Sequence, residues 1–348
     1  MKRRAFLRAS ATAAAVGAAG ATASADTAAG ASSGESTDRI VSSGESTDRI
    51  VPSGEYTDEY HDGVHYTRYV PDGGGADRPL VVMLHGCSQE PDEFAYATGM
   101  NALAAAEGFS VVYPDQSSFS NSFDCWNWYY DYNTARGSGE GADITSIALH
   151  EVDRLGADAS RVYVAGFSAG AAMVPNLLVA YPDVYAAGAV HSGLEYDAAE
   201  TATGATWSMT YGGPDPEAQA LDAYEAMVGN DVVGRTPTAV FHGTDDYTVD
   251  PVNGYQAAVQ AAGTSDYVGD GAADGDVSWS PSETATGSTG GFDWQRERHV
   301  DAQGRVAVER WTVDGLGHDW SGGASGATYA EPDAPSATDA IWRFFERW

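Results

Sequence analysis

Residues Arg161 to Met173 read RVYVAGFSAGAAM, in which a short apolar run is followed by a turn of small residues and then by helix-forming residues. The run from Val162 to Ala165 is typical of a strand buried on both faces. The segment from Ala169 to Ala180 predicts a helix of small and apolar residues. A buried strand that leads directly into a helix is the repeating unit of α/β proteins, so this stretch predicts that class.

The same alternation continues on both sides of this stretch, which predicts a mostly parallel central sheet with helices on both faces. Strands are predicted at residues 65–70, 79–84, 109–113, 161–165, 186–190, 238–242 and 305–313. Helices are predicted at residues 92–106, 140–155, 169–180 and 337–348. Two stretches rich in Gly, Ser, Thr and Asp, residues 196–235 and 263–298, are predicted as loop insertions over the edge where the strands end.

The N-terminal 61 residues have a different composition from the rest. Residues 1–25 begin with KRRAFLR and continue with an Ala-rich stretch, an order that resembles a twin-arginine export signal. The sequence SSGESTDRIV then occupies residues 32–41 and again 42–51, and PSGEYTDEYH follows at 52–61. We interpret residues 26–61 as a flexible linker, with a short binding repeat as the alternative, and residues 62–348 as the folded domain. The twin-arginine export machinery would then deliver the protein outside the cell.

The charge balance is strongly acidic. The chain has 50 Asp and Glu against 18 Lys and Arg, a formal net charge of −32, which makes nucleic acid a poor partner. Such a surface predicts that the protein needs high salt, because salt screens the repulsion among its carboxylates. No segment after the signal has the roughly 18 apolar residues of a membrane span, so no membrane anchor is expected. Acidic clusters such as residues 266–276 are more typical of solvated surface than of a calcium site, and we predict no metal.

The pentapeptide Gly-Phe-Ser-Ala-Gly centres on Ser168 and fits the pattern Gly-x-Ser-x-Gly. A second match centres on Ser32, but that serine lies in the linker. Ser168 alone follows a buried strand and precedes a helix, as a nucleophile elbow requires. The sequence therefore predicts Ser168 as the nucleophile of an α/β-hydrolase fold.

A serine nucleophile needs a histidine base and a carboxylate that orients it. His318 is the best candidate base because it follows the last predicted strand in a glycine-rich loop, GLGHDWSGG. The carboxylate should follow the strand before it, where Asp245 and Asp246 compete. The order Ser, Asp, His along the chain is the one that α/β-hydrolases use.

The loop after the 79–84 strand reads His-Gly-Cys-Ser at residues 85–88. We expect the backbone N–H groups of Cys87 and Ala169 to form an oxyanion hole. Cys87 and Cys125 are the only cysteines, and an even count in an exported chain favours a disulfide over two free buried thiols.

Taken together, these motifs resemble the extracellular poly(3-hydroxybutyrate) depolymerase and carbohydrate esterase family 1 group, which includes feruloyl and acetyl xylan esterases. The stretches that carry the resemblance are PLVVMLHGCSQ, VVYPDQS, CWNW, RGSGEGADI, RVYVAGFSAGAAM, YPDVYAAGAVHSGLEY, FHGTDDYTV and WTVDGLGHDWSGG. The resemblance covers almost the whole chain beyond the linker.

The resemblance implies a serine esterase without a cofactor that works through an acyl-enzyme. It assigns the triad to Ser168, Asp246 and His318, and it pairs Cys87 with Cys125. Trp128 and Trp320 would border the acyl site, although hydrophobic packing is an equal alternative for both.

The substrate would be a polyhydroxybutyrate-type polyester or its oligomers, with feruloyl or acetyl esters of xylan as the alternative. A non-catalytic surface-binding protein on a hydrolase scaffold is the alternative from a different class. No polymer-binding module follows the domain before Trp348, so we expect action on soluble or amorphous substrate.

Overall fold

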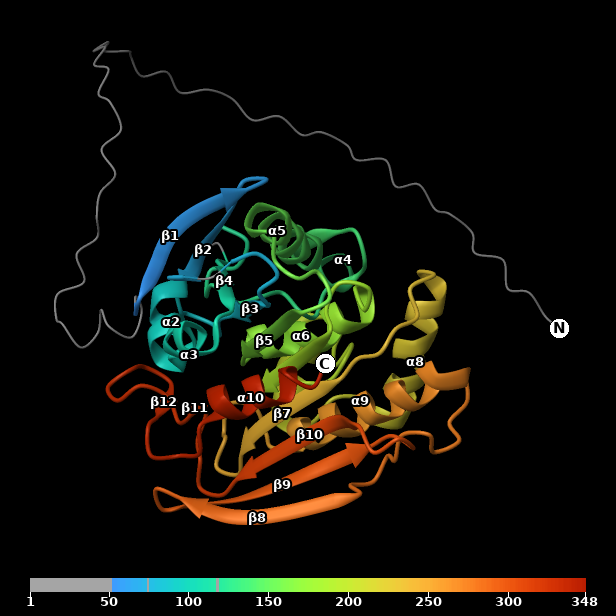
Figure 1. Ribbon diagram of the computed structural model, residues 1–348. Coiled ribbons are helices and arrows are strands. Elements are labelled where there is room, and N and C mark those ends of the chain that lie inside the picture. Colours follow the sequence, from blue (N-terminus) through green and yellow to red (C-terminus); the bar gives the residue numbers. More distant parts are fainter. Residues whose placement is uncertain (1–51, 74, 117–118) are drawn as a thin grey trace, which may run out of the picture. The chain divides into compact units, whose positions relative to one another are not determined.

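The computed structural model describes residues 52–73, 75–116 and 119–348 (Figure 1). The predicted export signal, the first two copies of the repeat and the Ser32 pentapeptide lie outside the described residues.

Ten strands form one sheet in the order β1-β2-β4-β3-β5-β6-β7-β10-β9-β8. The strands β4, β3, β5, β6, β7 and β10 run parallel to one another, and antiparallel strands flank them on both sides. Their bounds are β1 (Gly54–His61), β2 (Val64–Pro71), β3 (Leu80–Leu84), β4 (Ser110–Pro114), β5 (Val162–Phe167), β6 (Ala187–His191), β7 (Thr238–Gly243), β8 (Glu283–Thr289), β9 (Phe292–Val300) and β10 (Val306–Val313). A short parallel pair, β11 (Trp320–Ser321) and β12 (Ala330–Glu331), forms a separate sheet.

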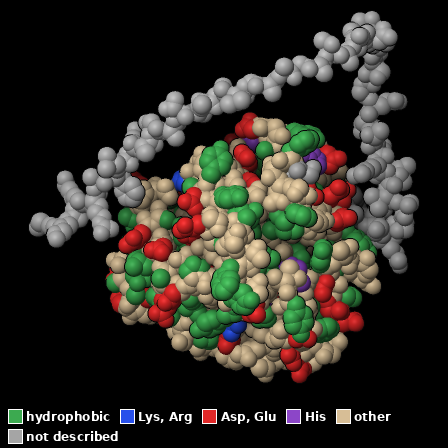
Figure 2. Space-filling view, turned by 180° about the vertical axis from the view of Figure 1, so that it is seen from behind, with side chains coloured by type: hydrophobic (Ala, Val, Ile, Leu, Met, Phe, Trp, Pro, Cys, Tyr) green, Lys and Arg blue, Asp and Glu red, His purple; other side chains and the backbone are tan. Residues whose placement is uncertain are grey.

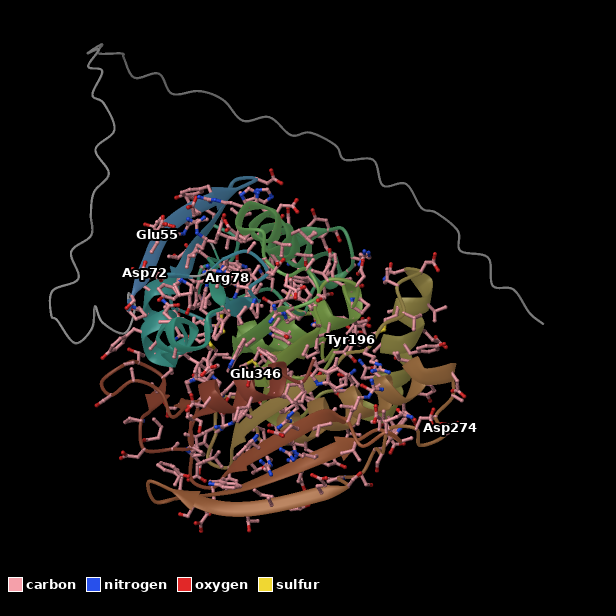
Figure 3. All side chains as sticks on the ribbon, in the orientation of Figure 1. Glu55, Asp72, Arg78, Tyr196, Asp274 and Glu346 are labelled. Atoms are coloured by element: carbon pink, nitrogen blue, oxygen red, sulfur yellow. A yellow bond between two sulfur atoms is a disulfide. The ribbon has the colours of Figure 1, made fainter. Side chains whose placement is uncertain are left out.

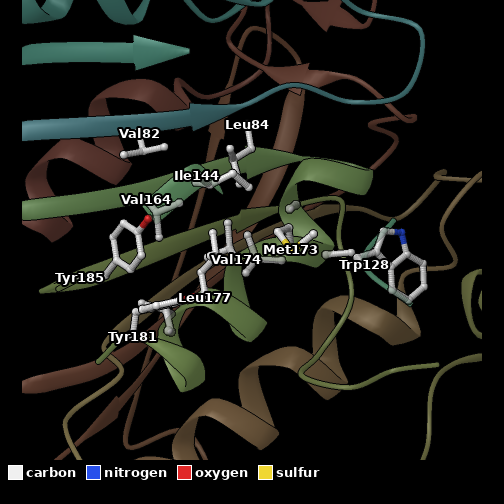
Figure 4. Close-up of a cluster of buried hydrophobic side chains, with 14 of the residues drawn as sticks. Val82, Leu84, Trp128, Ile144, Val164, Met173, Val174, Leu177, Tyr181 and Tyr185 are labelled. Carbon is white, nitrogen blue, oxygen red and sulfur yellow. The ribbon is translucent and has the colours of Figure 1, made fainter. Parts of the chain in front are cut away.

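Helices cover both faces of the large sheet, and the side chains of β3 show how the layers form. Val81 and Met83 belong to a buried cluster that includes side chains of α2, α3 and α10, whereas Leu80, Val82 and Leu84 belong to one that includes side chains of α5, α6 and α9. Figure 4 shows the second layer, in which side chains of α6 lie against those of β3 and β5. The helix bounds are α2 (Pro91–Thr98), α3 (Met100–Glu107), α4 (Asp131–Thr134), α5 (Gly139–Leu155), α6 (Ala169–Ala180), α7 (Ala202–Tyr211), α8 (Pro216–Gly229), α9 (Val252–Asp270) and α10 (Ala337–Phe345). The predicted parallel sheet with helices on both faces is confirmed.

Three predicted segments differ from the structure. The helix expected at residues 92–106 is two helices, because Gly99 adopts a left-handed conformation with φ 64° and ends α2. The stretch 196–235, predicted as a loop, contains α7 and α8, whose first turns are capped by the side chains of Thr201 and Asp215. The stretch 263–298, also predicted as a loop, holds the end of α9, strand β8 and most of β9.

The third copy of the decapeptide is a strand, so the predicted linker extends too far. Residues 54–61 form β1, which pairs antiparallel with β2 along its whole length. Tyr56 stands where the first two copies have Ser36 and Ser46, and its hydroxyl donates to Asp92 at 2.9 Å while its ring lies 6.4 Å from that of Tyr113. The aromatic side chain at this position therefore packs β1 against the folded domain.

Acidic side chains are spread over the face seen in Figure 2, with few basic ones among them. The acidic loop after α9, marked by Asp274 in Figure 3, is organised by Asp266. This buried carboxylate accepts from the backbone of Gly275 and Val277 and from the indole N–H of Trp279. Its oxygens therefore hold the loop by hydrogen bonds.

Within the described ranges, no helix has the length and apolar character needed to cross a membrane.

Candidate active site

Ser168 lies in the turn between β5 and α6 with φ 54° and ψ −118°. A positive φ is rare for a residue with a side chain and marks a strained turn. Close backbone contact explains the two flanking glycines: a Cβ on Gly170 would lie 2.2 Å from the carbonyl oxygen of Leu84, and one on Gly166 would lie 2.4 Å from that of Gly170. The strand-turn-helix geometry is that of a nucleophile elbow.

Asp246 and His318 meet although 72 positions separate them in the sequence. Asp246 follows β7 and His318 follows β10, and these two strands are parallel neighbours. The His318 ring donates from Nδ1 to Asp246 Oδ2 at 2.8 Å. Asp245 is exposed, so the structure brings the predicted Asp246 rather than Asp245 to the histidine.

Asp246 is 2% exposed and accepts several hydrogen bonds. Its Oδ1 accepts from the backbone N–H groups of Thr248 at 2.9 Å and Val249 at 2.8 Å. Burial alone would raise the pKa of Asp246, but hydrogen bonds from His242 and His318 and from the Val249 backbone together lower it well below its usual range. The carboxylate is therefore ionised and can hold the Nδ1–H tautomer of His318, which leaves Nε2 free to act as a base.

Two further histidines support this pair. His242 Nε2 donates to the carbonyl oxygen of Val249 at 2.9 Å and lies 3.4 Å from Asp246 Oδ2. His191 accepts at Nε2 from the backbone N–H of Ser321 at 3.0 Å, which fixes the loop that carries His318. Burial lowers the pKa of His191 to about 3, so this ring stays neutral and can accept.

The loop after β3 lies beside Ser168, since a Cβ on Gly86 would be 3.3 Å from the Cβ of Ser168. His85 holds the loop: its Nδ1 donates to the Gly86 carbonyl at 2.8 Å and its Nε2 accepts from the backbone of Gln116 at 3.1 Å. Burial lowers the pKa of His85, consistent with this neutral form. The predicted disulfide between Cys87 and Cys125 is present.

The backbone N–H groups around this loop are mostly occupied. Gly86 donates to the Gln89 side chain at 2.9 Å, and Ser88 donates to the carbonyl oxygen of Phe123 at 2.8 Å. Among the described residues, the N–H groups of Cys87 and Ala169 have no acceptor. These are the two donors that the sequence predicts for an oxyanion hole, and both remain available to a ligand.

The Ser168 hydroxyl makes no hydrogen bond to His318 within the described part of the chain. Phe167, the residue directly before Ser168, has its ring centroid 4.8 Å from that of His318. Hydrogen bonds between a nucleophile and its base are often long in the absence of substrate, so this geometry is compatible with a nucleophile and base that align on binding.

The two tryptophans predicted to border the acyl site lie in the hydrophobic core. Trp320 is 1% exposed, and its indole N–H donates to Thr338 at 3.0 Å. Trp128 is 4% exposed and lies near Met173 of α6 (Figure 4). Packing, the alternative that the sequence left open, accounts for both positions.

Sequence reasoning gave no role to Tyr329 or Glu140. Tyr329 is 41% exposed, and its ring lies 6.3 Å from that of His318, so an exposed aromatic side chain lies beside the histidine. Glu140 accepts from the backbone and side chain of Asn127 and from the side chain of Gln116, and it thereby fixes the CWNW segment. Glu140 lies in the RGSGEGADI stretch, but the partners of its side chain lie in a separate segment that the stretch does not indicate.

Among the residues that the structure describes, no group of three or more His, Cys, Asp and Glu side chains is arranged to hold a metal ion. The candidate site brings together a serine at a strained turn, a histidine with an ionised partner, and two free backbone donors. Together with the parallel sheet, these features define the α/β-hydrolase class of proteins.

The family model for esterase PHB depolymerases matches residues 64–275, and the chain belongs to this family. It is 34% identical over 251 residues to poly(3-hydroxyalkanoate) depolymerase C of Paucimonas lemoignei, covering 72% of this chain and 57% of that protein. It is also 34% identical over 188 residues to feruloyl esterase B of Thermothelomyces thermophilus, covering 53% of this chain and 64% of that protein. The chain thus spans less than two thirds of the length of either relative.

Acetylxylan esterase A of Aspergillus ficuum is 31% identical over 212 residues, covering 59% of this chain and 69% of that protein. A solved structure of an acetyl xylan esterase from Aspergillus awamori has a TM-score of 0.66 at 22% identity. The alignment covers 85% of this chain and 100% of the other, which shows that the two share a fold.

Proposed function

We propose that this protein hydrolyses carboxylic esters through an acyl-enzyme formed on Ser168. The observation that carries the proposal is the 2.8 Å hydrogen bond from His318 to the ionised Asp246, at the sheet edge where the Ser168 turn lies. The family, whose model is that of an esterase, supports the same chemistry.

In the first half-reaction, Ser168 Oγ attacks the ester carbonyl carbon while His318 Nε2 takes the hydroxyl proton. Collapse of the tetrahedral intermediate breaks the bond to the alcohol oxygen, which leaves with the proton from His318. In the second half-reaction, His318 removes a proton from water, and the hydroxide attacks the acyl carbon. The acid is released when Ser168 recovers its proton from His318.

The negative charge on the intermediate needs donors that are already in place. The unoccupied N–H groups of Cys87 and Ala169 supply two, and the N-terminus of α6 adds a favourable dipole. The disulfide to Cys125 would hold the Cys87 donor in position, because it ties the loop to the segment before Trp126.

A polyhydroxybutyrate-type polyester or its oligomers is the substrate that we favour, because the match to the depolymerase covers the largest part of this chain among the relatives described above. Feruloyl or acetyl esters of xylan are the second candidate, supported by the relatives of those names and by the shared fold. We also propose that the protein acts outside the cell, which its disulfide supports.

Three measurements in molar salt test the proposal. Wild-type protein should clear emulsified poly(3-hydroxybutyrate) and should release little acetate or ferulate from acylated xylan. An organophosphonate should label Ser168, and Ser168→Ala should abolish both labelling and ester hydrolysis. Activity retained by Ser168→Ala would refute the acyl-enzyme, whereas preferential release of acetate or ferulate would transfer the assignment to xylan.

A further inference from the structure

Helix α7 presents an uncharged aromatic face on a protein whose net charge is −32. Its sequence, ATGATWSMTY, holds no charged residue. Trp207 and Tyr211 are each 65% exposed, and their ring centroids lie 4.5 Å apart. The other exposed side chains of the helix are Ala202, Thr203, Thr206 and Thr210. The outer surface of α7 therefore consists of two rings, methyl groups and hydroxyls.

Helix packing does not account for the two rings, because other residues of α7 face the protein. Ala205 and Ser208 are buried, and the Ser208 hydroxyl donates to the carbonyl oxygen of Ala198 at 2.6 Å. Neighbouring large aromatic side chains that face water are a recurring mark of an interaction surface. Because α7 has no charged residue while the chain as a whole is strongly acidic, we infer that the partner of this face is uncharged.

Backbone contacts fix α7 to the loop that carries Asp246. The carbonyl oxygen of Met209 accepts from the backbone N–H of Asp250 at 2.8 Å and from the side chain of Asn253 at 3.3 Å. Tyr247, which follows Asp246 on this loop, is 92% exposed, so the loop adds a third exposed ring to the two on α7. A polymer that lies on α7 is thereby held beside the loop of the candidate active site.

We propose that the Trp207–Tyr211 face of α7 is the docking surface for the polyester, and this inference rests on the proposed function. A polyester chain carries no charge and has methyl or methylene groups along its length, so the two rings can remove its apolar surface from water. The carboxylates elsewhere on the surface have no partner in such a polymer and would lose hydration on contact. The α7 face is thus the part of this region that a polyester can cover at little cost.

The test separates adsorption from hydrolysis by using the Ser168→Ala background. Adsorption to amorphous poly(3-hydroxybutyrate) particles is measured by sedimentation in molar NaCl for this variant alone and with Trp207→Ala and Tyr211→Ala added. Tyr60→Ala is the matched control, because Tyr60 is 71% exposed on β1, at the far end of the strand order from β7. Circular dichroism checks that each variant folds. If the double variant does not fold, the two single variants are measured in its place.

We expect the double variant to adsorb at least about tenfold more weakly than its parent and the Tyr60 variant to adsorb normally. In the active protein, Trp207→Ala with Tyr211→Ala should keep kcat/KM on a soluble p-nitrophenyl ester within about twofold of wild type. Unchanged adsorption would overturn the proposal, as would binding of the Ser168→Ala parent to acetylated xylan but not to polyester. If the wild-type protein does not hydrolyse esters, the proposed function is refuted. The adsorption measurement stays valid in that case, because it uses the inactive Ser168→Ala background.

Discussion

Glu195 is a buried carboxyl group whose protonation should control stability. It is 1% exposed, and in the described part of the chain neither of its carboxyl oxygens has a hydrogen-bond partner. It lies between β6 and α7, directly before Tyr196, which is labelled in Figure 3. Burial, with smaller effects from Asp215 and Asp197, raises the pKa of Glu195 to about 8.

The sign and size of the effect follow from linkage. Between the unfolded pKa of about 4.3 and the folded pKa of about 8, the native protein keeps a proton that the unfolded chain has lost, so stability falls as pH rises. At about 1.4 kcal/mol per pH unit, the total loss is about 5 kcal/mol, and it is complete above the folded pKa. Burial also raises the pKa of Asp197, to about 6, which adds a loss of the same sign.

Glu195→Gln replaces the protonated acid with a neutral side chain of the same shape and should remove this dependence. Urea unfolding of both proteins at constant ionic strength, from about pH 5 to about pH 9, should show wild type losing about 4 kcal/mol relative to the variant. Glu225→Gln removes the same charge from an exposed position of α8 and should follow wild type. Parallel curves for wild type and Glu195→Gln would refute the reasoning.

Other features of the site and the surface give predictions of their own. Asp246→Asn should lower kcat on a soluble ester by roughly 10,000-fold, because the histidine loses the acceptor that fixes its tautomer; a loss below about tenfold would exclude that role. Cys87→Ala with Cys125→Ala opens a cross-link spanning 38 positions and should lower the free energy of unfolding in urea by about 4 kcal/mol. Gly170→Ala should cost about 3 kcal/mol or more through its backbone contact, whereas Gly229→Ala, with open space, should cost little. If the acidic surface makes the protein salt-dependent, its melting temperature should rise from about 0.1 M to about 3 M NaCl, and a flat profile would contradict this.

The central strands and their helices were predictable because each buries a continuous apolar segment. The strand predicted at 161–165 is β5 at Val162–Phe167, and the helix predicted at 169–180 is α6. The segment 196–235 was predicted wrongly because neither of its helices has a strong apolar stripe: α7 is rich in Thr and α8 in Ala. Their caps and their packing against α9 stabilise them, and such contacts between distant segments are not visible in local composition.

Local motifs led to Ser168, His318 and the loop at Cys87, since each lies in a short pattern with its own structural requirement. The choice of Asp246 over Asp245 came from family resemblance, and the structure supplies the reason: one side chain is buried against two histidines and the other is exposed. The burial of Trp320 could not be read from its neighbours in sequence. Its position depends on α10, which supplies Thr338 as the acceptor for the indole N–H.

The order of the strands explains how the candidate histidine and carboxylate come together. After α9 the chain forms β8 and β9 at the outer edge and then returns as β10, which pairs parallel with β7. The two following loops therefore leave the sheet side by side, and Thr244 joins them, donating to Asp314 at 3.0 Å and accepting from the backbone of Gly315 at 2.8 Å. The β8–β9 hairpin, predicted as a loop insertion, thus lies outside β10 and does not separate the loops that hold Asp246 and His318. Because the pair depends on β7 and β10 being neighbours, sequence changes in the hairpin should affect stability more than the histidine–aspartate geometry.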